Sequence, residues 1–233
     1  MSSQISTIGF DADDTLWQNE QFFRLTQDRF CDLLRDYTEA DALMDRLLAA
    51  ERRNIGHYGF GIKGFVLSMI ETAIEVTEEA VPASVIKELI TAGQDMLQHP
   101  IELLPHARAA VEAVAGQYHV LLITKGDLLD QERKLAQSGL GDLFDGVEIV
   151  SNKTAPVYHD IFHRHGAGPE RAMMIGNSMK SDVVPVIDAG GWGVFVPHGV
   201  TWELEHADAP EGHARFRELP DLGGLTDLLA ELT

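Results

Sequence analysis

A short apolar run near the amino terminus ends abruptly in acidic residues. Ile8-Gly9-Phe10 leads directly into Asp11-Ala12-Asp13-Asp14. Because the chain turns where a strand ends, the side chains of Asp11 and Asp13 can both point at one place. Two carboxylates held together repel each other unless a cation or a shared proton relieves them, and a divalent metal that prefers oxygen ligands is the simplest such cation. The run therefore predicts a buried strand that ends at a metal site.

The chain after residue 100 alternates short apolar runs with stretches of helical periodicity. This alternation is typical of repeated strand and helix units, and hence of a parallel sheet. Strands are predicted at 5–11, 119–124, 146–150, 171–175 and 193–197, and helices near 105–116, 127–138, 156–165 and 181–189. The pattern predicts an α/β core with a doubly wound, mainly parallel sheet.

A different pattern separates the first strand from the rest of this core. From Glu20 to about Gln98 the apolar residues recur at helical spacing and no strand is evident. We expect four or five helices here. The predicted organisation is a core made of residues 1–16 and 100–233, with a helical domain inserted at 17–99.

Composition limits the classes of function. The 233 residues carry a formal charge of −19, and 45% of them are hydrophobic. This balance predicts a globular protein that does not bind nucleic acid. Cys31 is the only cysteine, which excludes an intramolecular disulfide and favours a cytoplasmic location. No leader or membrane span is expected, and the chain is expected to be a monomer or a homodimer.

Three further motifs fall at or near the ends of predicted strands. Leu121-Leu122-Ile123 leads into Thr124, and Gly176-Asn177-Ser178 is followed by Asp182. Lys153 follows the predicted strand 146–150. In doubly wound sheets, ligands bind outside the carboxyl ends of the strands. Asp11, Thr124 and Asn177 all fall at such ends.

Taken together, these motifs resemble those of the haloacid dehalogenase-like hydrolases, in particular the phosphatases with a helical cap. The first signature of that family is Asp-x-Asp-x-Thr after an apolar strand, matched here by Asp11, Asp13 and Thr15. The other motifs follow in the order of the family. The resemblance covers the first 17 residues and most of the chain after residue 100, whereas the segment between them matches no family pattern.

The resemblance implies hydrolysis of a small phosphorylated metabolite with Mg²⁺ as cofactor. Asp11 would attack phosphorus to give an aspartyl phosphate, and Asp13 would serve as general acid and base. The metal would be held by the Asp11 carboxylate, the Asp13 backbone carbonyl, and the loop that contains Asn177 and Asp182.

The resemblance also implies how the phosphoryl group is bound. Thr124 would offer its hydroxyl, Lys125 and Gly126 their backbone amides, and Lys153 a compact positive charge. The resemblance also places Thr15 among the residues that would bind the substrate.

Two residues outside the core are further candidates for substrate binding. Lys63 lies in the glycine-rich segment Tyr58-Gly59-Phe60-Gly61-Ile62-Lys63-Gly64, which is either a plain turn between helices or a loop that reaches the substrate. Trp17, where the chain leaves the core, could line the same space.

Two departures from the family pattern leave alternatives open. Asn177 stands where the phosphatases usually have Asp, and Asp14, where the family commonly has Gly, is expected to be a cap or turn residue. A neutral ligand at 177 weakens metal binding. It therefore leaves room for a metal-independent 2-haloacid dehalogenase, which Asp13 opposes, and for a low-turnover binding or regulatory protein. A phosphomutase is a third alternative.

Overall fold

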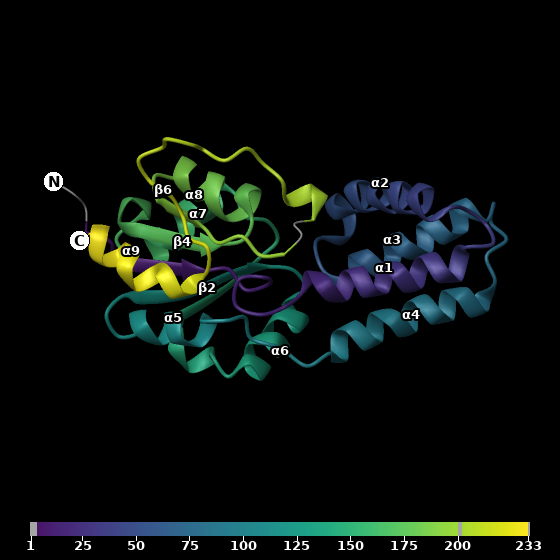
Figure 1. The fold of residues 1–233 in the computed structure, drawn as a ribbon, viewed down its shortest axis with the longest axis horizontal. Coiled ribbons are helices and arrows are strands. Elements are labelled where there is room, and N and C mark those ends of the chain that lie inside the picture. Colours follow the sequence, from purple (N-terminus) through teal and green to yellow (C-terminus); the bar gives the residue numbers. More distant parts are fainter. Residues whose placement is uncertain (1–3, 200–201, 233) are drawn as a thin grey trace. The chain divides into compact units, whose positions relative to one another are not determined.

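The computed structural model describes residues 4–199 and 202–232, and the chain forms two compact units (Figure 1). The first unit comprises the chain up to Glu20, Ile101–Lys125, and the chain from Gln131 onward. The second comprises Gln21–Pro100 and Gly126–Asp130. Compared with the predicted insert of 17–99, the second unit lacks Trp17–Glu20 and gains Pro100 and the short segment Gly126–Asp130.

The first unit is built on a six-stranded sheet with strand order β3-β2-β1-β4-β5-β6, in which all neighbouring strands run parallel. The strands are β1 (Thr7–Phe10), β2 (His119–Lys125), β3 (Gly146–Val150), β4 (Ala172–Gly176), β5 (Trp192–Phe195) and β6 (Phe216–Glu218). The predicted doubly wound parallel α/β fold is confirmed. The edge strand β6 was not predicted, since three partly exposed residues carry little apolar signal.

Helices cover both faces of this sheet (Figure 1). Helices α5 (Ala107–Val114) and α9 (Leu225–Leu232) belong to the apolar core on one face, and α7 (Ala155–His165) and α8 (Val184–Asp188) belong to the core on the other. Helix α6 (Leu128–Ser138) follows β2. Alternation in β1 places Ile8 and Phe10 in the first core, while a Cβ at Gly9 would lie 2.9 Å from Ile123 Cδ1. Glycine at this position therefore lets a neighbouring side chain pack against the strand.

The second unit contains four long helices and, among its described residues, no strand. They are α1 (Glu20–Leu34), which begins at the last residue of the first unit, α2 (Ala40–Tyr58), α3 (Ile62–Val76) and α4 (Ala83–Gln98). Their apolar faces meet in a core of their own that includes Phe30, Leu47, Phe65 and Met69. The helical periodicity of this region thus reflects one buried stripe per helix.

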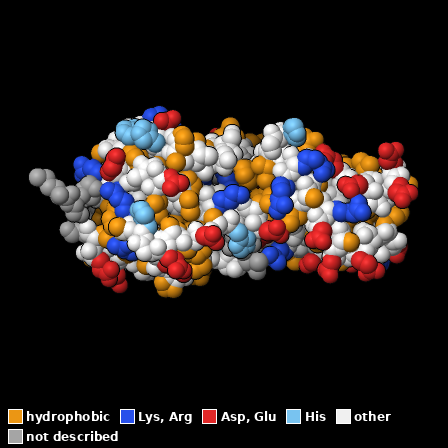
Figure 2. Space-filling model, turned by 90° about the horizontal axis from the view of Figure 1, so that it is seen from above, with side chains coloured by type: hydrophobic (Ala, Val, Ile, Leu, Met, Phe, Trp, Pro, Cys, Tyr) orange, Lys and Arg blue, Asp and Glu red, His pale blue; other side chains and the backbone are white. Residues whose placement is uncertain are grey.

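The visible face of each unit mixes charged and apolar side chains (Figure 2). In Figure 2 acidic and basic side chains are spread over the visible face of each unit, with apolar side chains between them. Within residues 4–199 and 202–232, the structure has no helix with the length and apolar character needed to cross a membrane.

Candidate active site

The parallel register brings three strand ends together. Phe10 of β1 is paired with Leu122 of β2 and with Ile175 of β4. Asp11 therefore follows β1 at the level where β2 approaches Thr124 and β4 approaches Asn177, and the Asp11 amide donates to the Ile175 carbonyl at 2.9 Å. The side chains that the sequence placed at strand ends share one edge of the sheet.

Lys153 lies between two carboxylates at this edge. Its Nζ is 2.5 Å from Asp11 Oδ1 and 2.6 Å from Asp182 Oδ1, and its side chain is only 1% exposed. Burial alone lowers the pKa of Lys153, but the two carboxylates outweigh it and raise the pKa above its ordinary value. Lys153 is therefore a buried cation that touches the proposed nucleophile.

The pKa of Asp11 is raised to about 7, first by burial and then by the charge of Asp182, while Lys153 opposes the shift. The other oxygen of Asp11 accepts a hydrogen bond from the Thr15 hydroxyl at 3.1 Å. The same hydroxyl accepts a hydrogen bond from the backbone N–H of Asn177 at 3.1 Å. Thr15, which was predicted to bind substrate, thus ties the loop after β1 to the loop after β4.

A set of oxygen atoms meets on the side of Asp11 that faces away from Lys153. One terminal atom of the Asn177 side-chain amide lies 3.3 Å from Asp11 Oδ2 and 3.2 Å from the Asp13 carbonyl oxygen. With oxygen at this position, three oxygens converge without a proton between them. Adjacent ligands of octahedral Mg²⁺ at about 2.1 Å lie about 3.0 Å apart, so the donor set fits this ion. With nitrogen there, the amide would instead donate to both neighbours.

Asp182 is linked to Asp11 by Lys153, whose ammonium contacts both carboxylates. It is fully buried, its Oδ2 accepts from the Ser178 amide at 3.0 Å, and its Oδ1 lies 3.5 Å from the hydroxyl of Tyr158. A Cβ at Gly176 would overlap the Asp182 carboxylate. Within the described ranges, no three His, Cys, Asp or Glu side chains gather as metal ligands, so the oxygen set depends on the amide and the main-chain carbonyl.

Asp13 is held by three donors, Trp17 in the loop after β1 and Gln131 and Lys134 on α6. Trp17 Nε1 donates to Oδ1 at 2.7 Å, Gln131 Nε2 donates to Oδ2 at 2.8 Å, and Lys134 Nζ contacts both oxygens at 2.9 and 3.1 Å. Trp17 is fully buried. The substrate-lining role of Trp17 stays a prediction, whereas its contact with Asp13, like those of Gln131 and Lys134, was not foreseen. The sequence signal that could have revealed Gln131 and Lys134 is their spacing of three residues, which places both on one face of α6.

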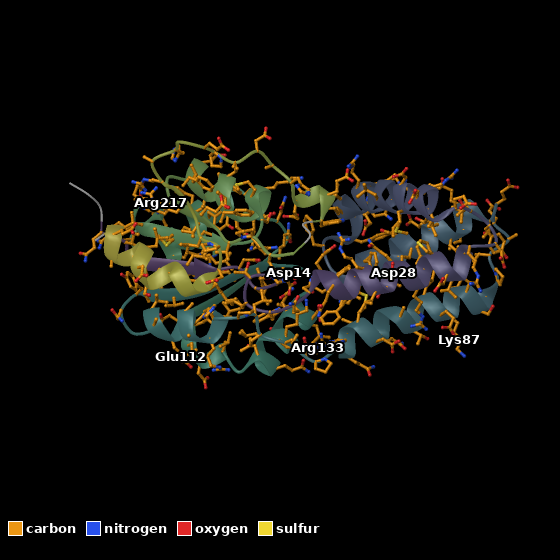
Figure 3. The ribbon with its side chains drawn as sticks, in the orientation of Figure 1. Asp14, Asp28, Lys87, Glu112, Arg133 and Arg217 are labelled. Atoms are coloured by element: carbon orange, nitrogen blue, oxygen red, sulfur yellow. The ribbon has the colours of Figure 1, made fainter. Side chains whose placement is uncertain are left out.

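Asp14 lies close to the start of α1 (Figure 3). Its carboxylate accepts from the amides of Asn19 and Glu20 at 2.9 Å each, where α1 begins. The residue has a positive φ of 59°, a conformation in which glycine is usual and Asp is tolerated. Asp14 therefore acts as the cap that was expected, at a position where the family commonly has Gly.

The end of β2 and the residue that follows it, Gly126, offer backbone amides and the Lys125 ammonium. Thr124 is buried, and Gly126 has a φ of 139° that favours glycine. The Lys125 ammonium donates to Ser181 Oγ at 2.7 Å and pairs with Glu205. Glu205 and Tyr158 were not predicted, because each reaches the site only through the tertiary fold.

Lys63 has a defined partner in the helical unit. Its Nζ is 3.1 Å from Asp127 Oδ1, and its side chain is 58% exposed. Asp127 follows Lys125 by two residues in the sequence. The contact between Lys63 and Asp127 thus links the glycine-rich segment to the residues that follow Gly126 in the sequence.

Comparison with known proteins identifies the family. The family model for haloacid dehalogenase-like hydrolases matches residues 5–190. A glyceraldehyde 3-phosphate phosphatase of Methanothermobacter thermautotrophicus is 21% identical over 243 aligned positions, covering 97% of this chain and 100% of the relative. A pyrimidine 5′-nucleotidase of Escherichia coli is 27% identical over 135 positions, covering 55% of this chain and 57% of the relative.

Comparison with solved structures points to the same family. The crystal structure of a haloacid dehalogenase-like family hydrolase from Xanthomonas campestris matches with a TM-score of 0.88 and 42% identity, covering 98% of this chain and 91% of the other. This chain therefore belongs to the haloacid dehalogenase-like hydrolases.

Proposed function

We propose that the protein is a Mg²⁺-dependent phosphatase that hydrolyses a small phosphate monoester through an aspartyl phosphate. The observation that carries the proposal is the position of Asp11, whose two oxygens face different partners. One oxygen contacts the ammonium of Lys153, and the other joins the oxygen set formed with Asn177 and the Asp13 carbonyl. A carboxylate arranged in this way could attack an anionic group, because the Lys153 ammonium on one side and a Mg²⁺ bound by the oxygen set on the other would reduce the repulsion.

The metal would be held by Asp11, the Asp13 carbonyl and Asn177, with Asp182 acting through Lys153. When bound, Mg²⁺ supplies charge neutralisation for the nucleophile and the phosphoryl oxygens. Lys153 supplies the second positive charge, and its two carboxylate partners keep it in place. Thr124 and the amides of Lys125 and Gly126 would bind the remaining phosphoryl oxygens.

Asp13 would protonate the leaving oxygen and later take a proton from water. Its oxygens together accept four hydrogen bonds in this structure, which is about the number that a carboxylate can accept. Proton transfer to a substrate therefore requires Asp13 to exchange one of these bonds. We infer that Trp17, Gln131 and Lys134 hold the resting position from which this exchange starts.

The substrate class is inferred from the two relatives, which act on glyceraldehyde 3-phosphate and on pyrimidine 5′-nucleotides. Both are small phosphate monoesters. The helical unit would serve as the cap that selects among such substrates, and Lys63 is its candidate contact with the substrate. Closure of the cap would also exclude water from the attack step.

A second candidate is a binding or regulatory protein with little turnover. It is favoured by the alternative placement of the Asn177 amide, in which nitrogen donates to Asp11 and to the Asp13 carbonyl. In that orientation the amide would satisfy both oxygens and compete with the metal.

A screen of phosphate release from small phosphate esters, with and without Mg²⁺, tests the proposal. Release should require Mg²⁺ and should fall to background in Asp11→Asn, while Asp28→Asn on the exposed surface of α1 should behave as wild type. Undiminished release by Asp11→Asn would show that another residue attacks phosphorus. Binding of phosphate esters without release at any Mg²⁺ concentration would favour the second candidate.

A further inference from the structure

The segment around Glu205 is hydrogen-bonded to the loop that follows β4. Glu205 ends the short helix Glu203–Glu205. Its Oε2 accepts from the hydroxyls of Ser178 at 2.5 Å and Ser181 at 2.6 Å, and its Oε1 pairs with the Lys125 ammonium. The exposed fractions of the Glu205 and Lys125 side chains are 13% and 15%. Glu205 thus forms a largely buried junction between three segments of the α/β unit.

The backbone of the same segment adds a further contact. Lys180 Nζ donates to the carbonyl oxygen of Leu204 at 2.7 Å. Although burial raises the pKa of Glu205, Lys125 and the two serine hydroxyls lower it below its ordinary value. The carboxylate is therefore held as an anion by groups that belong to the loops after β2 and β4.

The loop that Glu205 contacts also carries Asn177 and Asp182. Ser178 follows Asn177, and Ser181 precedes Asp182. From Met179 to Val183 the chain forms a π-helical turn, which begins directly after Ser178 and contains Ser181 and Asp182; this rare conformation is frequent at functional sites. Glu205 thus binds a hydroxyl at the start of this turn and another within it.

We propose that Glu205 is a positioning residue for the metal loop, holding the Asn177 amide oxygen where the oxygens of Asp11 and Asp13 meet. This inference rests on the proposed Mg²⁺-dependent function. Groups that orient metal ligands typically change metal affinity by about 10- to 100-fold when they are removed. The effect should be clear here because a neutral amide ligand contributes little charge attraction and depends on its placement.

The test is direct binding of Mn²⁺, followed by electron paramagnetic resonance and by competition with Mg²⁺. Glu205→Ala should weaken Mn²⁺ binding by about tenfold or more. Glu205→Gln, whose amide oxygen can still accept from the serines, should lie between this variant and the wild type. Glu211→Ala is the matched control, because Glu211 is exposed on the chain that follows, and its affinity should be unchanged.

Kinetics and thermal unfolding separate positioning from plain stabilisation. In Glu205→Ala the Mg²⁺ concentration for half-maximal activity should rise in parallel with the Mn²⁺ dissociation constant, whereas kcat at saturating Mg²⁺ should stay within about threefold of wild type. A lower melting temperature with unchanged Mn²⁺ affinity would refute the positioning role. If Glu205→Ala does not fold, Ser181→Ala and Glu205→Gln carry the test, and wild-type affinity in both would refute it.

The two proposals fail in different ways. Wild-type protein that binds no Mn²⁺ at millimolar concentration would refute the metal-dependent function and this inference with it. Wild-type binding that Glu205→Ala leaves unchanged would refute the positioning role alone.

Discussion

Replacing Lys153 with Met tests whether the buried cation is what allows two carboxylates to share the site. The Lys153 Nζ contacts to Asp11 and Asp182 are 2.5 and 2.6 Å long. At an effective dielectric constant of about 20, each contact is worth about 6 kcal/mol of Coulomb attraction, and the cost of burying the three charges cancels much of this. Removing one member of a buried ion pair generally costs about 3–5 kcal/mol, so this is the expected loss in unfolding free energy.

Thermal unfolding in the presence of a chelator measures this loss. For a chain of this size, about 3–5 kcal/mol corresponds to a melting temperature lower by roughly 6–20 °C. Lys87→Met is the control, because Lys87 is exposed on α4 (Figure 3) and a surface change should stay within about 0.5 kcal/mol.

Addition of Mg²⁺ provides a second readout. A dication beside Asp11 should relieve the repulsion left in Lys153→Met, so Mg²⁺ should raise the melting temperature of this variant by more than it raises that of wild type. An unfolding free energy within about 1 kcal/mol of wild type in chelator would show that the carboxylates do not depend on Lys153.

Three further changes test neighbouring parts of the site. Gly176→Ala places a Cβ where the Asp182 carboxylate lies, so it should cost about 1–3 kcal/mol in urea unfolding and reduce phosphate release; normal stability would mean that Asp182 moves freely. Asp14→Ala removes the cap of α1 and should cost about 0.5–2 kcal/mol, and a melting temperature equal to wild type would contradict the capping role. Lys63→Ala should change relative kcat/KM across a panel of phosphate esters by about tenfold, or about 1.4 kcal/mol, without changing the Mg²⁺ requirement; identical kinetics would remove Lys63 from the substrate site.

The core of the fold was predictable because parallel strands buried on both faces give continuous apolar runs. The strands β1, β2, β4 and β5 leave such runs, β3 leaves a weaker one that is interrupted by Glu148, and the helical unit leaves a 3.6-residue period. The edge strand β6, Phe216–Glu218, and helix α9, Leu225–Leu232, escaped prediction. The strand is too short and too polar to show a period. Helix α9 does carry apolar residues at helical spacing, Leu225, Leu228 and Leu229, and the prediction overlooked them.

The same reasoning explains which site residues the sequence could reveal. Asp11 and Asn177 follow strands directly, so their place at the edge of the sheet comes from local pattern and topology alone. Glu205 bonds with Lys125 across 80 positions and Lys134 with Asp13 across 121. Such pairs depend on how loops and helices pack, and this information is not present in any short stretch of sequence.

Under the proposed function, the amide at position 177 weakens the binding of the metal and strengthens the binding of the substrate. Asp11, Asp182 and Lys153 together carry a net charge of −1, and Asp13 is balanced by Lys134. A dication would bring this centre to +1, whereas an acidic residue at 177 would leave the loaded centre neutral. Asparagine thus makes the empty centre less attractive to Mg²⁺ and the loaded centre more attractive to a phosphate dianion. Each of the two should consequently strengthen the binding of the other, by the same factor in both directions.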